Sequence, residues 1–183
     1  MSLFIQKGFS NTTLNEIAQQ INVTRGAIYW HYPDKLHIIN ELIETEHENL
    51  SALFNELFVE EVSTFSQIEN ILESIVAYFF DNKSFRDFIE LTWFKIEYTQ
   101  LSNISIRKTE MTSEFINQFT RIVDQAQKLG LVRGDVMAKE VAITCVNMIN
   151  GLYRLYFIVP DQINNKQQAT DSFINYLQLI KCD

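Results

Sequence analysis

The sequence predicts an all-α fold, and three observations support this class. Turn residues are scarce, with 5 Gly and 2 Pro in 183 residues, and only Pro33 interrupts the chain between Gly26 and Gly130. Sheets built from hairpins need such residues more often. Apolar side chains recur instead with the helical period of 3.6 residues. Hydrophobic residues make up 46% of the chain, which is enough for a sizeable helical core.

The first two predicted helices are short. Residues 2–7 are expected to be the end of a helix that Gly8 terminates. Residues 13–21 form the next, because Thr13 and Glu16 have the spacing of a capping box. The apolar side chains of this second helix share one face; they are Leu14, Ile17, Ala18 and Ile21.

A tight turn and a third short helix follow. Asn22 and Val23 form the predicted turn, and Thr24 is expected to cap a helix that runs to His31. Two short helices joined by such a turn form the helix-turn-helix pattern. We expect Val23 and Ile28 to pack on the face that carries Ile17 and Ile21.

Longer helices are predicted after this motif. Pro33 favours the start of a helix, whereas Gly130, Gly134 and Pro160 mark later boundaries. The expected helices span residues 35–58, 65–81, 84–100, 104–129, 135–158 and 167–181.

The predicted helix at residues 24–31 has the composition of a DNA-recognition helix. In a helix-turn-helix the second helix enters the major groove. Arg25 can bind guanine or phosphate, Gly26 lets the backbone approach DNA, and the rings at 29–31 can contact sugar and phosphate. Lys35 begins a helix whose N-terminus also suits a phosphate. The alternative is that the rings at 29 and 30 fill a core and Arg25 is merely solvated. The predicted DNA contacts are Thr13, Thr24, Arg25, Gly26, Tyr29, Trp30, His31 and Lys35.

The run TTLNEIAQQINVTRGAIYWHYPDK, residues 12–35, resembles the DNA-binding domain of TetR/AcrR-family transcriptional repressors. Their shared pattern is T-x-x-x-I-A-x-x-x-x-V-(S/T)-x-G-x-x-Y-x-H-F-x-x-K. The matching residues are Thr13, Ile17, Ala18, Val23, Thr24, Gly26, Tyr29, His31 and Lys35. Tyr32 departs from the usual Phe, which adds only a hydroxyl. The resemblance implies that Thr13, Thr24, Arg25, Tyr29, His31 and Lys35 lie at the DNA.

A second departure from this family concerns the first helix. Members usually carry about four helical turns with a basic tail in front, whereas only MSLFIQK precedes Gly8 here. We therefore expect a truncated first helix, which would give the helix-turn-helix less support. We place the DNA-binding domain at residues 1–46 and a helical effector-binding and dimerisation domain at residues 47–183.

The later runs ELTWFKIEYTQLS, INGLYRLYFIVP and YLQLIKC resemble the efflux-pump repressor branch of the same family. The resemblance implies a homodimer, an inverted-repeat DNA operator and release of that operator when a small molecule binds between the middle helices. Binding would move the paired reading helices out of register with major grooves about 34 Å apart.

Aromatic residues in the middle of the chain are candidates for the effector site. Rings with interleaved carboxylates would favour an aromatic or cationic molecule. The alternative is that the rings form the core and the carboxylates are solvated. The candidate residues are Phe79, Phe88, Trp93, Glu97, Phe115 and Phe119.

Two apolar helix faces near the C-terminus are candidates for the dimer interface. Paired across a two-fold axis, they would form a four-helix contact. The alternative is that they pack inside one chain. The candidate residues are Val141, Cys145, Met148, Leu152, Tyr156, Phe173, Tyr176, Leu177 and Ile180.

Charge and cysteine content set the remaining expectations. The net charge is −8, but residues 1–40 carry a net +1, so a local DNA-binding face remains compatible with the composition. Two distant cysteines suit a reducing cytoplasm, and Asn147, Asn150 and Arg154 interrupt the most apolar late stretch, so no membrane span is expected.

The sequence lacks the G-x-S-x-G, H-E-x-x-H, P-loop and G-x-G-x-x-G motifs, so we expect neither an enzyme nor a cofactor. Glu44 with His47 and Asp34 with His37 have the spacing of metal ligands, but both pairs lie on one expected helix, ten residues apart, and no metal site is predicted.

The sequence thus predicts a ligand-responsive, DNA-binding repressor. Two alternatives remain open. One is a DNA-binding protein of the same fold without a small-molecule effector. The other is a helical ligand-binding dimer that does not bind DNA.

Overall fold

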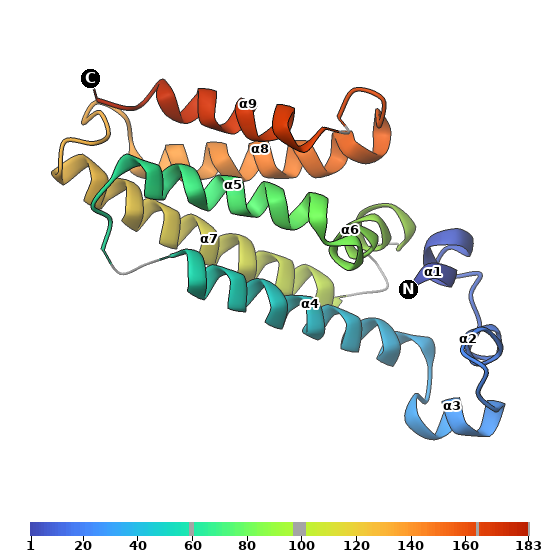
Figure 1. Cartoon of the computed structure of the whole chain (residues 1–183). Helices are drawn as coiled ribbons and strands as arrows, with labels where there is room; N and C mark the ends of the chain where they lie inside the picture. Colours follow the sequence, from blue (N-terminus) through green and yellow to red (C-terminus); the bar gives the residue numbers. More distant parts are fainter. Residues whose placement is uncertain (59–60, 97–101, 164, 183) are drawn as a thin grey trace. The chain divides into compact units, whose positions relative to one another are not determined.

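The structure is a computed structural model that describes residues 1–58, 61–96, 102–163 and 165–182, with the backbone alone at residues 102–105, 107 and 108. The described residues are helical apart from their connections and one isolated β-bridge, which joins Val132 to Lys181 (Figure 1). This confirms the predicted all-α class. The elements are α1 Ser2–Lys7, α2 Leu14–Gln20, α3 Arg25–His31, α4 Lys35–Leu57, α5 Phe65–Asp81, α6 Lys83–Glu90, η1 Leu91–Lys95, α7 Ser102–Lys128, α8 Ala138–Ile158 and α9 Lys166–Gln178.

The chain forms two compact units. The first unit comprises Met1–Leu50 and Ser84–Thr109, and the second comprises Ser51–Lys83 and Glu110–Asp183. The predicted domain boundary at residues 46 and 47 lies inside α4, which is continuous from Lys35 to Leu57.

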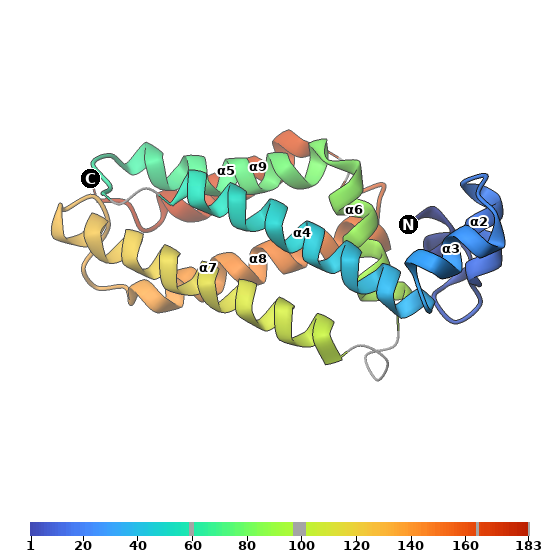
Figure 2. The ribbon, with the colours of Figure 1, turned by 90° about the horizontal axis from the view of Figure 1, so that it is seen from below.

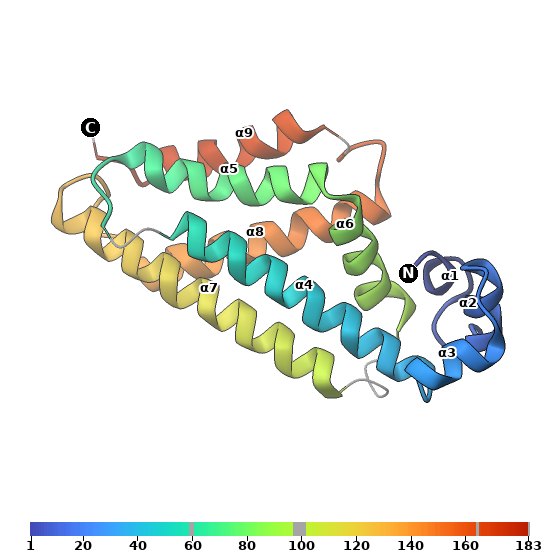
Figure 3. The same ribbon diagram turned by 60° about the horizontal axis from the view of Figure 1, so that its bottom comes forward.

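The first unit has two apolar clusters that hold its helices together. Leu14, Ala18 and Ile28 join α2 to α3. The second cluster joins α1, α4 and the segment after α6; its buried members are Phe4, Phe9, Ile39, Ile43, Leu91 and Ile96. Figure 3 shows α1, α2 and α3 gathered at the N-terminal end of α4.

The predicted helix at 84–100 is α-helical only as far as Glu90. Helix α6 ends at Glu90, η1 is a π-helical turn, and Ile96 is extended at φ −123° and ψ 130°. The Thr92 hydroxyl donates to the carbonyl of Phe88 at 2.9 Å, a contact that disturbs helices locally. Burial of Ile96 against Phe4 and Phe9 then favours the extended backbone, so tertiary packing overrides the helical pattern. Residues 97–100 of the prediction lie outside the described residues.

The second unit is built around α5, α8 and α9. Helix α9 packs along α5 (Figure 2). It also contacts α8. Between α5 and α8 the ring of Phe79 stacks on Tyr153, with their centroids 4.5 Å apart. An ion pair between Lys166 and Asp81 joins α9 to the end of α5 at 2.8 Å.

Helix α8 is the one described helix with the length and hydropathy of a membrane span. Its buried residues include Val141, Cys145, Leu152 and Tyr153, which lie in the interior of the second unit. Burial in the core therefore accounts for part of its apolar composition, whereas other apolar side chains of this helix are exposed.

Candidate nucleic-acid interface

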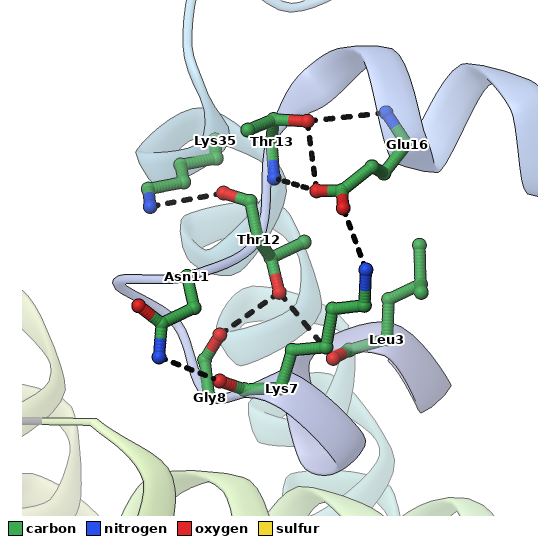
Figure 4. Close-up of polar contacts among 8 residues, drawn as sticks. All are labelled: Leu3, Lys7, Gly8, Asn11, Thr12, Thr13, Glu16 and Lys35. Carbon is green, nitrogen blue, oxygen red and sulfur yellow. Dashed lines mark hydrogen bonds and ion pairs between the residues drawn. The ribbon is translucent and has the colours of Figure 1, made fainter.

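The start of α2 is fixed by a complete capping box (Figure 4). The Thr13 hydroxyl accepts from the backbone N–H of Glu16 at 3.2 Å, and the Thr13 N–H donates to Glu16 Oε2 at 2.9 Å. Lys7 Nζ lies 2.6 Å from the other carboxylate oxygen of Glu16. Hydrogen bonds from Lys7 and then from Thr13 lower the pKa of Glu16 to about 2, so this carboxylate stays ionised and the end of α1 stays tied to α2.

The turn before α3 has the expected form. Asn22 adopts φ 55°, and the N–H of Val23 donates to the carbonyl of Ala18 at 2.9 Å. Thr24 caps α3, because its hydroxyl oxygen accepts from the N–H of Ala27 at 3.1 Å. These bonds determine the angle at which α3 leaves α2.

The predicted apolar packing between α2 and α3 is confirmed for Ile28 and is wrong for Ile21 and Val23. Ile28 is buried against Leu14 and Ala18, as expected. Ile21 and Val23 are exposed instead, at 58% and 40%. The reason is that α2 ends at Gln20, so Ile21 is a cap residue and its side chain leaves the apolar face of the helix.

The outer face of α3 presents aromatic rings to solvent. Trp30 is 82% exposed and Tyr29 is 43% exposed, so the alternative that these rings fill a core is wrong. The guanidinium carbon of Arg25 lies 5.4 Å from the centre of the Tyr29 ring. Trp30 and His31 meet edge to face at 4.7 Å. Arg25 with Tyr29 and Trp30 with His31 thus form two exposed pairs on α3, and we call these four side chains the reading face.

Gly26 lies in the first turn of α3, and the fold does not require a glycine there. A Cβ added at this position would meet only Thr24 Oγ1, at the ordinary contact distance of 4.0 Å. Glycine weakens a helix relative to alanine by up to ~1 kcal/mol. Packing in the free protein therefore does not account for a glycine at this position.

Lys35 has three partners inside the protein. Its Nζ donates to the carbonyls of Phe9, Ser10 and Thr12 at 2.6, 2.9 and 3.0 Å, and it also lies 4.6 Å from the centre of the Phe9 ring. Figure 4 shows the bond to Thr12. An ammonium has three N–H donors, so all of them are engaged. Lys35 therefore connects the loop between α1 and α2 to the first turn of α4.

The basic groups near the reading face are mostly engaged. Lys7 pairs with Glu16, and Lys35 is held by carbonyls. His37 lies 2.9 Å from Asp34, an acid whose pKa is lowered mainly by the hydrogen bond from that histidine. Within residues 1–50, Arg25 is the one Lys or Arg side chain that is neither ion-paired nor held by carbonyls.

The predicted effector residues are divided between the two units. Phe79 stacks with Tyr153, whereas Phe115 and Phe119 stack on each other at 5.5 Å and contact Phe58. These three rings are buried in the second unit. Phe88 and Trp93 belong to the first unit, where Phe88 packs on the cluster of Phe4 and Phe9 and Trp93 is half-buried. Glu97 lies outside the described residues.

A surface cavity of about 500 Å³ lies in the second unit, and none of the predicted effector residues lines it. Its walls come from the end of α4, the second half of α5 and the connection that follows. The lining residues are Leu53, Ser74, Ala77, Tyr78, Asp81, Asn82 and Lys83.

Most of the predicted dimer residues are buried within the single chain. Met148, Tyr156 and Tyr176 are half-buried, while the fully buried ones are Val141, Cys145, Leu152, Phe173, Leu177 and Ile180. Burial raises the pKa of the Cys145 thiol to about 12. Sequence reasoning missed a second apolar stripe on α8, where Ile143, Leu155 and Ile158 are exposed. Apolar residues occur on more than one face of this helix in the sequence. This pattern is the signal that one face packs inside the chain while another is left for a second contact.

No group of three or more His, Cys, Asp or Glu side chains in the described part of the chain is placed to hold a metal ion. Asp34 and His37, one of the two pairs with ligand spacing, bind each other.

Comparison with known proteins gives two family matches. Residues 1–42 match the model of bacterial regulatory proteins of the tetR family, and residues 63–182 match the C-terminal region of MAATS-type transcriptional repressors.

Individual relatives cover nearly the whole chain. The HTH-type transcriptional regulator AcrR of Shigella flexneri is 27% identical over 93% of this chain and 80% of its own length. The regulator TtgR of Pseudomonas putida is 26% identical over 96% of this chain and 86% of its own length. Among solved structures, the complex of SmeT with triclosan superposes with a TM-score of 0.77 at 18% identity, over 96% of this chain and 86% of SmeT, which shows the shared fold.

Proposed function

Because the chain belongs to the TetR family of bacterial regulatory proteins, we propose that it is a cytoplasmic repressor that binds an inverted-repeat operator as a homodimer and releases it when a small organic molecule binds. One observation carries the DNA-binding role: α3 exposes Arg25, Tyr29 and Trp30 to solvent while Ile28 anchors the helix. A core helix would bury these rings.

The dimer is supported by the exposed stripe on α8. Ile143, Leu155 and Ile158 are apolar side chains between 39% and 53% exposed, and Gly151 between them has open space around it. A self-complementary contact of such a face would produce two-fold symmetry. Two copies of α3 would then read half-sites about 34 Å apart.

The effector is supported by the relatives. SmeT is a repressor of a multidrug efflux pump in Stenotrophomonas maltophilia and was solved with triclosan. We propose that the helical part of this chain likewise takes an aromatic or cationic organic molecule. To admit it, Phe79 would have to separate from Tyr153, or Phe115 from Phe119, since each pair of rings is now stacked.

A direct test is selection from a random duplex library with the purified chain at moderate salt. Enrichment of an inverted repeat is the expected result, with two half-sites one helical turn or a multiple apart. Failure to enrich any sequence, in a sample whose helical content and dimeric state are intact, would contradict the proposal.

One observation favours a second candidate, a DNA-binding protein of the same fold without a small-molecule effector. Phe79 stacks on Tyr153 and Phe115 stacks on Phe119, and none of the predicted effector residues lines the described cavity of about 500 Å³. Melting temperatures measured against a library of aromatic and cationic compounds distinguish the two. An effector-gated repressor gains stability as the ligand concentration rises, whereas the second candidate shows no change with any compound.

Arg25→Ala is expected to relax sequence preference. Its guanidinium can bind a guanine through two hydrogen bonds and is positioned by its contact with the Tyr29 ring. We expect discrimination at one base pair of each half-site to fall by about 1–3 kcal/mol, while the melting temperature stays unchanged. Binding of single-base operator variants measures this. An equal loss of affinity on every sequence would show that Arg25 contacts phosphate only.

Gly26→Ala is expected to raise the melting temperature of the free protein and to lower its affinity for the operator. The free protein has room for the added methyl group, and alanine favours the helix by up to ~1 kcal/mol, so the melting temperature should rise by about 2–4 °C. Operator affinity should fall, because the methyl group would meet the DNA. Unchanged affinity would place Gly26 away from the DNA surface.

Operator binding is expected to depend only weakly on salt. Arg25 is the one Lys or Arg of residues 1–50 that is not engaged inside the protein, so this region brings at most one free basic side chain per protomer to the DNA. Two copies in a dimer predict a slope of about −2 for log K against log salt concentration. Titrations between low and physiological salt measure it. A slope of about −6 or steeper would mean that basic residues elsewhere in the chain reach the DNA.

A further inference from the structure

A buried carboxylate in the first unit is only partly accounted for by its contacts in the fold. Glu46 is only 3% exposed and lies on the core-facing side of α4. The other buried residues on that side are Ile39, Ile43 and Leu50. Glu46 therefore occupies a position that the helical pattern assigns to an aliphatic side chain, and Leu or Ile would fit the pattern better.

The carboxylate is only half satisfied. Ser84, in the first turn of α6, donates its hydroxyl to Glu46 Oε1 at 2.9 Å. The second oxygen, Oε2, is buried and has no hydrogen-bond partner. No Lys, Arg or His in the described part of the chain forms an ion pair with Glu46.

Such an arrangement is unfavourable in the ligand-free protein. A buried carboxylate needs a cation or several hydrogen bonds to offset the loss of its hydration. The single neutral bond from Ser84 supplies neither. A metal ion is a poor partner, because no group of three or more His, Cys, Asp or Glu side chains is placed to bind one among the described residues.

We propose that Glu46 Oε2 is the acceptor for the protonated amine of an organic effector. This inference rests on the proposed function and specifies it, since it assigns the effector a positive charge with at least one N–H donor. A charge-assisted hydrogen bond from an ammonium satisfies Oε2 and neutralises the buried charge at once. The apolar neighbours Ile43 and Leu50 suit the hydrocarbon part of such a molecule.

The position of Glu46 connects this site to the reading face. Glu46 and Lys35 lie on the same helix, eleven residues apart, which is about 16 Å along its axis. Both residues, together with Ser84, belong to the first unit, which also contains α3. An amine that approaches Glu46 must fit between α4 and the start of α6, where the bond from Ser84 now holds them together. Effector binding would thus act on the helix whose first turn anchors the DNA-reading helices.

The test uses phenylalkylamines of two to six methylene groups, each paired with the alcohol of the same length. Melting temperatures of the wild-type chain are measured against both series at a pH where the amine is charged. We expect the best amine to bind at least about tenfold more tightly than its alcohol. In Glu46→Gln, which keeps the shape and the bond from Ser84, this preference should disappear.

A matched control lies two residues away on the same helix. Glu48 is exposed, so Glu48→Gln removes the same charge without touching the interior and should keep the full preference for amines. The proposal is overturned if no amine stabilises the wild-type chain more than its alcohol, or if Glu46→Gln retains the preference. Operator selection without ligand tests the proposed function separately, so a chain that binds its operator but ignores amines would contradict only this inference.

Discussion

Lys35→Met is expected to weaken binding to every duplex in the same proportion and to lower the melting temperature of the free protein. Methionine keeps much of the length of the stem but leaves the carbonyls of Phe9, Ser10 and Thr12 without their shared donor. Losing hydrogen bonds to a charged group typically costs about 1.5–3 kcal/mol. The loop between α1 and α2 would then be released from the first turn of α4, and α3 would lose its fixed orientation.

The salt dependence of binding tells this supporting role from a direct phosphate contact. A lysine that binds phosphate contributes about one to the salt slope of each protomer. Because the ammonium of Lys35 is already engaged within the protein, we expect the slope to be unchanged in Lys35→Met while affinity and melting temperature both fall.

Lys7→Met is the matched control for Lys35. The Lys7 side chain is 46% exposed and forms one ion pair, with Glu16. Exposed pairs contribute up to about 1 kcal/mol, so its melting temperature should change little. A Lys35→Met protein as stable as the wild type, with a shallower salt slope, would show that Lys35 leaves its carbonyl partners and binds phosphate.

Glu46→Leu is expected to stabilise the ligand-free protein and to abolish its response to amines. Leucine extends the apolar stripe of Ile39, Ile43 and Leu50 on α4 and removes a buried oxygen without a partner. Replacing a buried, poorly paired charge with an apolar side chain often stabilises by about 1–4 kcal/mol. For a chain of this length each kcal/mol corresponds to about 2–4 °C in melting temperature.

The same variant should remain bound to its operator when amines are present. Such a combination of higher stability and lost response is the signature of a residue kept for function rather than for folding. Glu48→Leu, at an exposed position of the same helix, should leave both properties unchanged. If Glu46→Leu instead melts at a lower temperature and loses operator binding without ligand, then Glu46 and its bond to Ser84 support the fold.

The reading face was predictable from sequence because its determinants are local. The capping box of Thr13 and Glu16, the cap at Thr24 and the turn at Asn22 involve residues close together in the chain, and the structure contains all three. Their spacing was sufficient to identify a helix-turn-helix. The exposure of Trp30 also follows, since Ile28 alone supplies the anchor of such a short helix.

Features that depend on contacts between residues far apart in the chain could not be predicted from local sequence patterns. Lys35 has the family position of a DNA contact, yet its ammonium is bound by carbonyls 23 to 26 residues away. The end of α6 at Glu90 depends on the burial of Ile96 against α1. Helical periodicity describes one helix at a time and contains no information on either contact.

The sequence by itself therefore determined the all-α class, the helix-turn-helix and the composition of the reading face, since short-range hydrogen bonds and helical periodicity suffice for them. Only the tertiary structure decided which aromatic rings are core, which side of α8 stays exposed and that Glu46 is buried with one oxygen unpaired. The physical reason is that the burial of a side chain is a property of the elements packed around it. In this chain those elements come from segments far apart in sequence, as with Phe79 and Tyr153 or Glu46 and Ser84.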